Sequence, residues 1–476
     1  MSRSPSTPGC FGGFFRRRHS KTSARLATHQ HAPARTAEKV EPCVYTHANP
    51  CCGEWALPAV TDALPAYTPI RSAFNEKAID TAREEILAKA PALQEVSLFM
   101  FDHPELGYKE YKAHDKITSF LEDEGFEVEK HFLLPTAFKA TYTHGKGGRT
   151  FGLNSELDAL PEIGHACGHP LIAVAGLAAL LGLRAAMKKH DIDGTVVLLG
   201  TPAEEGGAGK VELLKLGGYK GMDACMMAHP GHGQAGSGGV APSLAIQTVN
   251  VEFFGKTAHA AGAPWDGINA LDAANLAYSA ISAMRQQLKT TDRVHGIITN
   301  GGQAPNIIPE HTQMRYFVRA TTVPALEELK KKIIPCFEAA AKATGCGVKI
   351  WTEVMTNDLR NCKPLAEEYA ATMMSQFNIP VPTLFHDWSA GGGSTDFGNV
   401  TYALPSCHPH FGIPFTPGRA NHTPEFTDKA RQPAAHAEAW KAAVGMASVG
   451  IRVLADETFA KEARKWWEGD MEGEFF

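Results

Sequence analysis

The chain has 476 residues and a hydrophobic content of 44%, which is enough to bury a sizeable core and favours two or three domains over one. Its formal net charge of -5 gives no sign of the broad positive field that nucleic-acid or membrane-surface partners favour, so small molecules are the expected partners. No apolar run is expected to reach the roughly 20 residues that cross a bilayer. Ten cysteines are too sparse for a disulfide scaffold, which favours a reducing compartment.

Residues 1–64 are predicted to form a disordered leader. The segment is rich in Ser, Thr, Pro, His and Arg, and it shows no apolar periodicity that would support a packed element. It lacks the apolar centre of a secretory signal, but it is rich in Arg and free of acid before Glu38. A mitochondrial targeting segment and a simple solvated tail both fit this pattern. The expected location is cytoplasmic, with the mitochondrion as the alternative.

Helices and strands alternate through the next part of the chain. Helical spacing of apolar residues predicts the helices, and short continuous apolar runs predict buried strands. The predicted elements are, in order, helices over 78–90, 92–100 and 112–124, a strand over 150–153, a helix over 171–188 and a strand over 194–200. This alternation indicates an α/β fold with a mainly parallel sheet and helices on both faces.

The pattern changes after Gly233 to strand, helix, strand, strand, helix, strand. The predicted elements are strands over 244–254, 293–299, 312–319 and 347–353, and helices over 267–288 and 325–344. This order is typical of a ferredoxin-like α+β domain. We therefore predict an inserted domain at 240–357 within a catalytic domain made of 65–239 and 358–476, which closes with a long helix over 429–454.

Four segments carry side chains suited to metal binding. They are Cys167 with His169, the pair Glu204 and Glu205, His229, and His422. Most of them follow a predicted strand or start a helix, and the carboxyl ends of strands are where loops converge in an open α/β sheet. The sequence therefore predicts that these side chains meet in one crevice.

Each of these residues also has a purely structural interpretation. A single Cys is usually a small buried hydrophobe, a single His a hydrogen-bonded structural residue, and neighbouring glutamates a solvated face. A nucleophilic thiol with a histidine base is the chemical alternative, because Cys167 lies near a helix N-terminus that would stabilise a thiolate. That reading leaves Glu204, Glu205, His229 and His422 without a role, whereas a metal pair uses them all.

Several longer motifs resemble a known family. They are 164–178 (GHACGHPLIAVAGLA), 201–206 (TPAEEG), 255–271 (GKTAHAAGAPWDGINAL), 300–309 (NGGQAPNIIP) and 393–399 (GSTDFGN). The chain is similar over about 75–455 to the di-metal aminopeptidase, carboxypeptidase and aminoacylase family, which includes the plant auxin-conjugate amidohydrolases. The resemblance implies two divalent metal ions, zinc or manganese, and implies that the inserted domain is a lid through which the protein forms a homodimer.

The resemblance also implies roles for single residues. Those that match metal ligands are Cys167, His169, Glu205, His229 and His422. Glu204 matches the general base, and Asp158 matches a residue that orients a ligand, although a helix or turn cap is its simpler reading. His259 matches a histidine that reaches into the partner's site to stabilise the oxyanion, although a His at a strand end is more often structural.

The remaining matches concern the substrate. Asn306 and Arg319 match positions that contact it, and a guanidinium suits a carboxylate. The backbone of Gly391, Gly392 and Gly393 is expected to hold the same end, although an ordinary loose loop also explains these glycines.

One position departs from many auxin-conjugate relatives, which carry Asp where this chain has Pro170. Proline suits the first turn of a helix, so the fold is expected to survive without any contact that the Asp makes. The expected activity is metal-dependent hydrolysis of dipeptides, and the nearest resemblance favours a basic C-terminal residue, as in β-alanyl-lysine. An N-acyl-amino-acid amidohydrolase with the same site is the first alternative, and a non-catalytic binding protein is the second.

Overall fold

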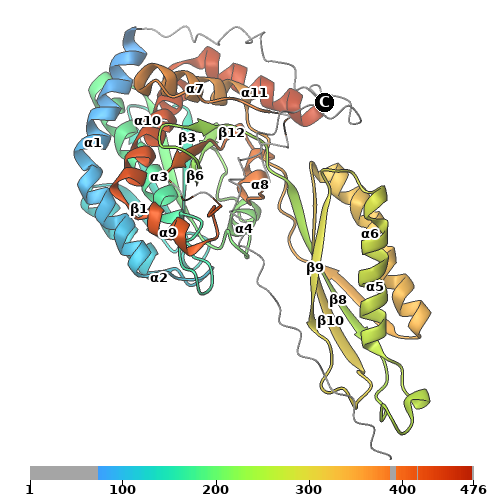
Figure 1. Ribbon diagram of the computed structural model, residues 1–476. Helices are drawn as coiled ribbons and strands as arrows, with labels where there is room; N and C mark the ends of the chain where they lie inside the picture. The colour runs from blue at the N-terminus through green and yellow to red at the C-terminus, as the bar shows by residue number, and fades with distance from the viewer. Residues whose placement is uncertain (1–72, 386, 388–392, 415, 417, 474–476) are drawn as a thin grey trace, which may run out of the picture. The chain divides into compact units, whose positions relative to one another are not determined.

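The computed structural model describes residues 73–385, 387, 393–414, 416 and 418–473 (Figure 1). The predicted leader over 1–64 lies outside the described residues, as do Gly391 and Gly392.

A six-stranded sheet forms the centre of the larger part of the chain. Its strand order is β1-β2-β4-β3-β5-β12. The strands are β1 (Glu127–Lys130), β2 (Phe138–His144), β3 (Thr150–Glu156), β4 (Gly194–Thr201), β5 (Ala224–Met226) and β12 (Ser406–Cys407). β3, β4, β5 and β12 run parallel, and the β1–β2 hairpin adds antiparallel strands at one edge. The predicted α/β class with a mainly parallel sheet is confirmed.

Helices cover both faces of this sheet, because its central strands are apolar on both sides. In β4, Val196 and Leu198 belong to one core cluster while Val197 and Leu199 belong to another. The first face packs against α3 (His169–His190) and α10 (Pro433–Ala455), and α1 (Ala73–Asp102) packs on the outside of these two helices (Figure 1). The second face packs against α4 (Gly209–Lys215) and α8 (Phe397–Thr401). The other helices here are α2 (Tyr111–Asp123), α7 (Lys363–Phe377), α9 (Pro424–Ala430) and α11 (Glu457–Glu472).

Two prolines act differently on the helices. The prediction of separate helices over 78–90 and 92–100 is wrong, because α1 runs without a break through Pro91. Pro91 lies on the exposed side, and buried Ile86 and Leu93 anchor the helix on either side of it. This packing outweighs the single backbone hydrogen bond that proline removes. The helix predicted over 429–454 begins later than predicted, because Pro433 occupies the first turn of α10. A separate short helix, α9, ends before this proline.

Helix α3 corrects the expectation that no apolar run is long enough to span a bilayer. Among the described residues it has the length and composition to do so, with a mean hydropathy of 1.9 over an 18-residue window that is 89% buried inside the protein. Gly176 and Gly182 do not interrupt the helix, and they lie where other elements pack closely against it. A Cβ at Gly176 would lie 2.6 Å from Oγ of Ser155 in β3, and one at Gly182 would lie 3.0 Å from the carbonyl oxygen of Ala82 in α1. The helix is apolar on all sides because other elements surround it.

The inserted segment folds as predicted. An antiparallel sheet of order β11-β8-β10-β9 carries α5 and α6 on one face (Figure 1). The elements are β8 (Ala245–Phe254), α5 (Ala270–Met284), β9 (Arg293–Asn300), β10 (His311–Ala320), α6 (Val323–Thr344) and β11 (Gly347–Thr352). This order confirms the ferredoxin-like class. The predicted domain boundaries at 240 and 357 enclose these elements and stay predictions.

Short elements complete the fold. A three-stranded sheet of order β6-β13-β7 is formed by β6 (His229–His232), β13 (His410–Ile413) and β7 (Gly238–Gly239). Two short 3-10 helices, η1 (Pro264–Asp266) and η2 (Arg285–Gln287), flank α5. β6 follows β5 closely along the chain, and it begins at His229, so the backbone of this predicted ligand is fixed by pairing with His410 of β13.

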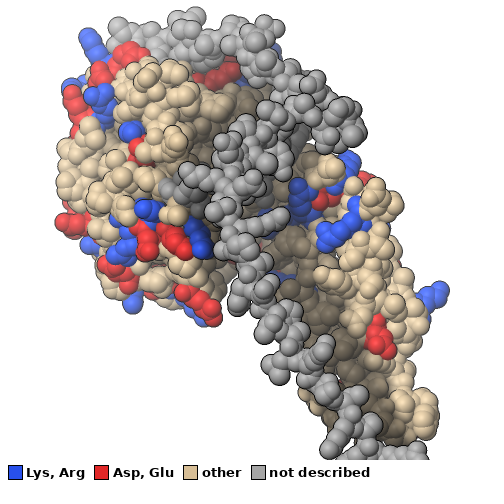
Figure 2. Space-filling model, viewed as in Figure 1, with Lys and Arg blue, Asp and Glu red and all other residues tan. Residues whose placement is uncertain are grey.

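Charged side chains of both signs are interspersed on the face shown in Figure 2. Some of the exposed charges pair within one helix turn, as Lys331 does with Glu328 and Lys215 with Glu212. Exposed pairs of this kind add little to stability, because water screens the charges and two long side chains must be held in place. The fold is therefore held by its apolar cores rather than by surface ion pairs.

Candidate metal centre

The turn before α3 brings Cys167 and His169 to the site. Gly168 caps the helix with φ 86°, a conformation that suits glycine. A Cβ at Gly168 would also lie 2.7 Å from Cγ of Pro230, so this turn packs directly against the segment that carries His229. Pro170 lies in the first turn of α3, as expected for a residue that donates no backbone hydrogen bond there.

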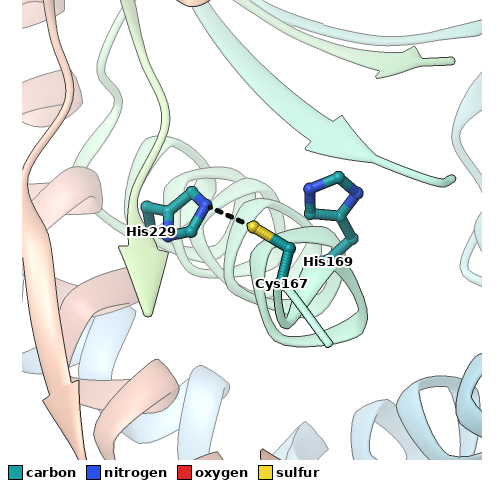
Figure 3. Close-up of side chains that lie close together, drawn as sticks. All are labelled: Cys167, His169 and His229. Atoms are coloured by element: carbon teal, nitrogen blue, oxygen red, sulfur yellow. Dashed lines mark hydrogen bonds between the residues drawn. The ribbon is translucent and has the colours of Figure 1, made fainter. Parts of the chain in front are cut away.

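The structure gathers the five predicted ligands into one donor cluster: Cys167, His169, Glu205, His229 and His422. Its donor atoms form two overlapping triads, each with all atoms within 4.8 Å of one another: Cys167, His169 and His229 in the first, and Cys167, Glu205 and His422 in the second. The Cys167 sulfur is common to both and lies 3.4 Å from Nε2 of His229 (Figure 3). Two triads that share one thiol would suit a pair of divalent cations, with Cys167 as a member of both ligand sets.

Several atoms of the donor cluster support this reading. Nε2 of His169 and Oε1 of Glu205 are buried and have no hydrogen-bond partner among the described residues. They lie 3.8 Å apart, and Nε2 of His422 lies 3.6 Å from the same Glu205 oxygen. Buried polar atoms are nearly always satisfied, so unpaired ligand atoms that lie this close together are the chemistry expected of a cation site. The residues therefore fit a pair of divalent cations, and thiolate with imidazole is a donor set that suits zinc.

Asp158 fixes two members of the donor cluster at once. Its carbonyl oxygen accepts a hydrogen bond from Nδ1 of His169 at 2.7 Å, which leaves Nε2 of that ring to face the cluster. Its carboxylate accepts the backbone N–H of Glu205 at 2.9 Å. Burial alone would raise the pKa of Asp158, but the interactions with His169 and with that N–H lower it. The main chain of Asp158 therefore orients His169 while its side chain caps the turn at Glu205, and its proposed role in the reaction stays a prediction.

The segment that carries Glu204 and Glu205, residues 202–210, is called the catalytic loop below. Ala203 has φ 58°, an uncommon conformation for a residue with a Cβ. Buried carboxylates hold the loop at three points. Glu110 accepts the N–H of Ala203 at 2.9 Å, Asp158 accepts that of Glu205, and Asp396 accepts that of Lys210 at 2.9 Å. The loop is thus fixed before any substrate arrives.

The electrostatics of Cys167 argue against a thiol nucleophile. Burial raises the pKa of the Cys167 thiol to about 12. Burial also lowers the pKa of His229, whose Nε2 lies 3.4 Å from the sulfur, well below its usual value. Against the effect of its own burial, the carboxylate of Glu156 raises the pKa of the other neighbouring histidine, His169, yet the pKa of the thiol stays raised. A reactive cysteine needs a lowered pKa, whereas metal coordination deprotonates a thiol directly. The surroundings of Cys167 therefore suit a ligand.

His259 and Asn306 lie together on the inserted domain. The N–H of Ala260 donates to the carbonyl oxygen of Asn306 at 3.0 Å. The N–H groups of Ala261 and Gly262 both donate to Nδ1 of His259, at 3.2 and 2.9 Å. Because Nδ1 accepts both N–H groups, Nε2 is the ring nitrogen of this exposed residue that is left to donate a hydrogen bond. These local hydrogen bonds fit the structural interpretation of His259, and its proposed role in stabilising the oxyanion stays a prediction.

Arg319 lies near the end of β10, whereas Asn306 precedes the start of that strand. Its Nη1 donates to Oγ of Ser394 at 3.2 Å, and its buried Nε has no hydrogen-bond partner. Asn306 precedes β10 and Arg319 is near its end, so at about 3.4 Å per residue the strand separates them by roughly 25 Å. The structure therefore does not bring His259 and Asn306 together with Arg319 in one protomer. Gly393 accepts the N–H of Leu244 through its carbonyl oxygen and makes an ordinary loop contact.

Sequence reasoning missed a second group of buried charged residues beside the donor cluster. Nζ of Lys210 lies 2.6 Å from Oε1 of Glu156 and 2.7 Å from Oδ1 of Asp396, and all three residues are buried. Burial alone would lower the pKa of Lys210, but Asp396 and Glu156 raise it, so the ammonium stays charged. Glu156 precedes the predicted Asp158 by two residues at the end of β3, and that proximity was the available signal.

Comparisons with known proteins agree with this site. Residues 245–345 match the model of a peptidase dimerisation domain. The chain is 40% identical to the mouse Xaa-Arg dipeptidase, over 83% of this chain and 93% of the relative, and 39% identical to the human Xaa-Arg dipeptidase, over 80% and 88%. The chain belongs to the M20 family of metallopeptidases.

A solved structure supports the same fold. A dinuclear metal-binding peptidase of the M20 family from Bacillus subtilis superposes with a TM-score of 0.57 at 20% identity, over 80% of this chain and 99% of that one. Membership of the M20 family makes the chain a hydrolase that acts on peptide bonds in a metal-dependent reaction. The predicted family resemblance and enzyme class are confirmed, while the roles of single residues stay predictions.

Proposed function

We propose that the chain hydrolyses dipeptides with a basic C-terminal residue, of which β-alanyl-lysine is an example. The observation that carries this proposal is the pair of donor triads sharing the Cys167 sulfur, with the carboxylate of Glu204 beside them. Two relatives of about 40% identity that are named for Xaa-Arg dipeptides support the substrate class.

The donor cluster would hold two divalent cations, zinc or manganese. The first triad supplies thiolate and imidazole, which favours zinc, while the carboxylate of Glu205 in the second triad also suits manganese. When bound, such a pair lowers the pKa of water towards neutrality and polarises the carbonyl of the scissile amide.

Glu204 is the proposed general base. Burial, together with the nearby carboxylates Glu156 and Asp396, raises the pKa of Glu204 well above its usual value, so its carboxylate is a stronger base than an exposed one. It takes a proton from the water that attacks the carbonyl carbon. The same proton then passes to the amide nitrogen as the C–N bond breaks, which gives a carboxylic acid and an amine, and the acid then ionises as its proton passes to the amine.

Residues of the inserted domain are proposed to bind the substrate. The Arg319 guanidinium has a buried Nε without a partner, which suits a bidentate contact with the C-terminal carboxylate. From the catalytic domain, backbone N–H groups of Gly391, Gly392 and Gly393 are proposed to bind the same carboxylate. The Nε2–H of His259 and the Asn306 amide are proposed to stabilise the negative charge that develops on the carbonyl oxygen.

This arrangement requires a second copy of the chain. Because roughly 25 Å of β10 separates Asn306 from Arg319, one small dipeptide does not reach both within one protomer. We therefore propose a homodimer in which His259 and Asn306 act in the partner's site. Mixing inactive His259→Ala and Glu204→Ala proteins tests this, since each mixed dimer then contains one site with both residues intact. Activity that returns on subunit exchange supports the proposal, and a mixture that stays inactive contradicts it.

The substrate proposal is tested with the purified full chain after chelation and after reloading with zinc or manganese. β-Alanyl-lysine, β-alanyl-norleucine and Nα-acetyl-lysine form a matched panel, because the second lacks only the cationic group and the third changes only the acyl part. Preference for β-alanyl-lysine supports the dipeptidase. Preference for Nα-acetyl-lysine supports the N-acyl-amino-acid amidohydrolase, and no metal-dependent turnover on any compound supports a binding protein.

A further inference from the structure

Lys210 lies at the start of α4, beside the candidate site, with none of its side chain exposed. Lys210, Glu156 and Asp396 are called the lysine cluster below. The Asp396 carboxylate binds Lys210 twice, through its ammonium at 2.7 Å and through its backbone N–H at 2.9 Å. A buried ammonium is tolerated only when it is paired and hydrogen-bonded. Lys210 meets this condition with two carboxylates.

The lysine cluster faces both the donor cluster and the proposed base. The second oxygen of Glu156, Oε2, lies 3.3 Å from Nε2 of His169 and has no hydrogen-bond partner. One carboxylate oxygen each from Glu156, Asp396 and Glu204 lie within 4.8 Å of one another. The carboxylates of Glu156 and Asp396 therefore lie directly beside Glu204, and that of Glu156 lies beside His169.

Three carboxylates at this separation repel one another in a buried setting. The Lys210 ammonium offsets that repulsion, and its short bonds to two of the carboxylates fix their positions. Glu204 and His169 have no such bond to Lys210, so their positions depend on Glu156 and Asp396 staying where Lys210 holds them. The catalytic loop ends at Lys210, whose backbone N–H donates to Asp396, so Asp396 is connected to the same backbone segment that carries Glu204.

We propose that Lys210 is a positioning residue for the hydrolytic reaction, one that holds Glu156 and Asp396 so that Glu204 and His169 keep their reactive geometry. The inference rests on the proposed function, because it assigns Lys210 a task in the reaction of that site. A purely structural role would instead make Lys210 important for stability alone.

Three variants separate these roles. Lys210→Met removes the ammonium while keeping the length of the side chain. Lys210→Met/Asp396→Asn restores the net charge of the cluster without restoring the lysine. Arg452→Met is the matched control, because Arg452 and Glu368 form a buried ion pair between α10 and α7. For each protein we would measure Tm, metal content, and kcat and KM for β-alanyl-lysine.

We expect Lys210→Met and Arg452→Met both to lower Tm, and only Lys210→Met to lower metal content and kcat. The expected loss in kcat is about 100-fold, the size that a misplacement of about 1 Å produces. KM should change less than about threefold, since the proposed substrate contacts lie elsewhere. The double variant should recover Tm while its kcat stays low.

Two results would overturn the inference. One is a Lys210→Met protein with the kcat of the wild type, and the other is a double variant that regains kcat together with Tm. If Lys210→Met does not fold, the double variant decides between the roles in the same way. A wild-type protein that turns over no dipeptide would instead contradict the proposed function, and the metal content of the variants would then still report whether Lys210 positions His169.

Discussion

The carboxylate of Glu110 accepts a hydrogen bond from the backbone N–H of Ala203, the residue directly before Glu204, at 2.9 Å. The same buried side chain accepts the N–H of Tyr108 and the hydroxyl of Thr136. Glu110 precedes α2, so it connects the first part of the chain to the catalytic loop at the point where Ala203 adopts its positive φ. The position of the proposed base therefore depends on a residue that never faces the substrate.

Replacing Glu110 tests this connection. Glu110→Ala leaves the buried N–H of Ala203 without an acceptor, at a cost of about 1–3 kcal/mol, and it releases the loop. We expect a lower Tm and a kcat reduced by at least about tenfold. Glu110→Gln should lose far less, because its amide still accepts from Ala203 and donates to Thr136. Steady-state kinetics measures kcat of the two variants. Equal losses would show that the hydrogen bond between residue 110 and the N–H of Ala203 does not control kcat.

The neighbouring glutamates of the catalytic loop should respond differently to substitution. Glu204→Ala is expected to lower kcat by about 100-fold to 10,000-fold, the range for a general base, while metal content stays close to normal. Glu205→Ala should instead release metal, because its carboxylate belongs to the second triad. Mass spectrometry of the native proteins gives the metal content. Loss of metal from Glu204→Ala would remove its assignment as a base that is not a ligand.

The shared thiol makes a distinct prediction for Cys167. Cys167→Ser is expected to weaken binding of both cations at once, because the sulfur belongs to both triads and a serine hydroxyl is a poorer ligand. Activity should fall and should recover in part at high zinc concentration. In a thiol hydrolase, by contrast, wild-type activity would survive chelation and Glu204→Ala would remain active. Either of these results would restore the nucleophilic reading of Cys167.

Buried histidines should make the fold less stable in mild acid. His436 is almost fully buried and its ring contacts Oγ of Ser97 and the carbonyl oxygen of Gln432. Burial lowers the pKa of His436 below the usual value of 6.5. Below pH 6.5 the unfolded chain binds a proton that the folded protein does not, so stability falls as the pH is lowered. His436→Gln should therefore lose less Tm between pH 7 and pH 5 than the wild type at equal metal content. An equal loss would assign the acid sensitivity to other groups.

The donor cluster was predictable because its members follow strands or start a helix, where loops of an open α/β sheet converge. Lys210 and Asp396 were not, because a single lysine after a glycine-rich loop has the same sequence pattern as an exposed helix residue. Helix α1 was predicted as two helices because the effect of Pro91 depends on packing on both sides of it, which local sequence does not contain. The separation of His259 from Arg319 likewise appears only once β10 is built.

Helix α3 has a consequence for how the protein is made. Its apolar surface is covered by α1, which precedes it, and by α10, which begins only at Pro433 after the whole inserted domain. During synthesis on the ribosome, α3 therefore emerges long before its last neighbour exists. Apolar surface left open in this interval favours aggregation, so efficient production of the enzyme should depend on chaperones that shield the nascent chain until the C-terminal helices arrive.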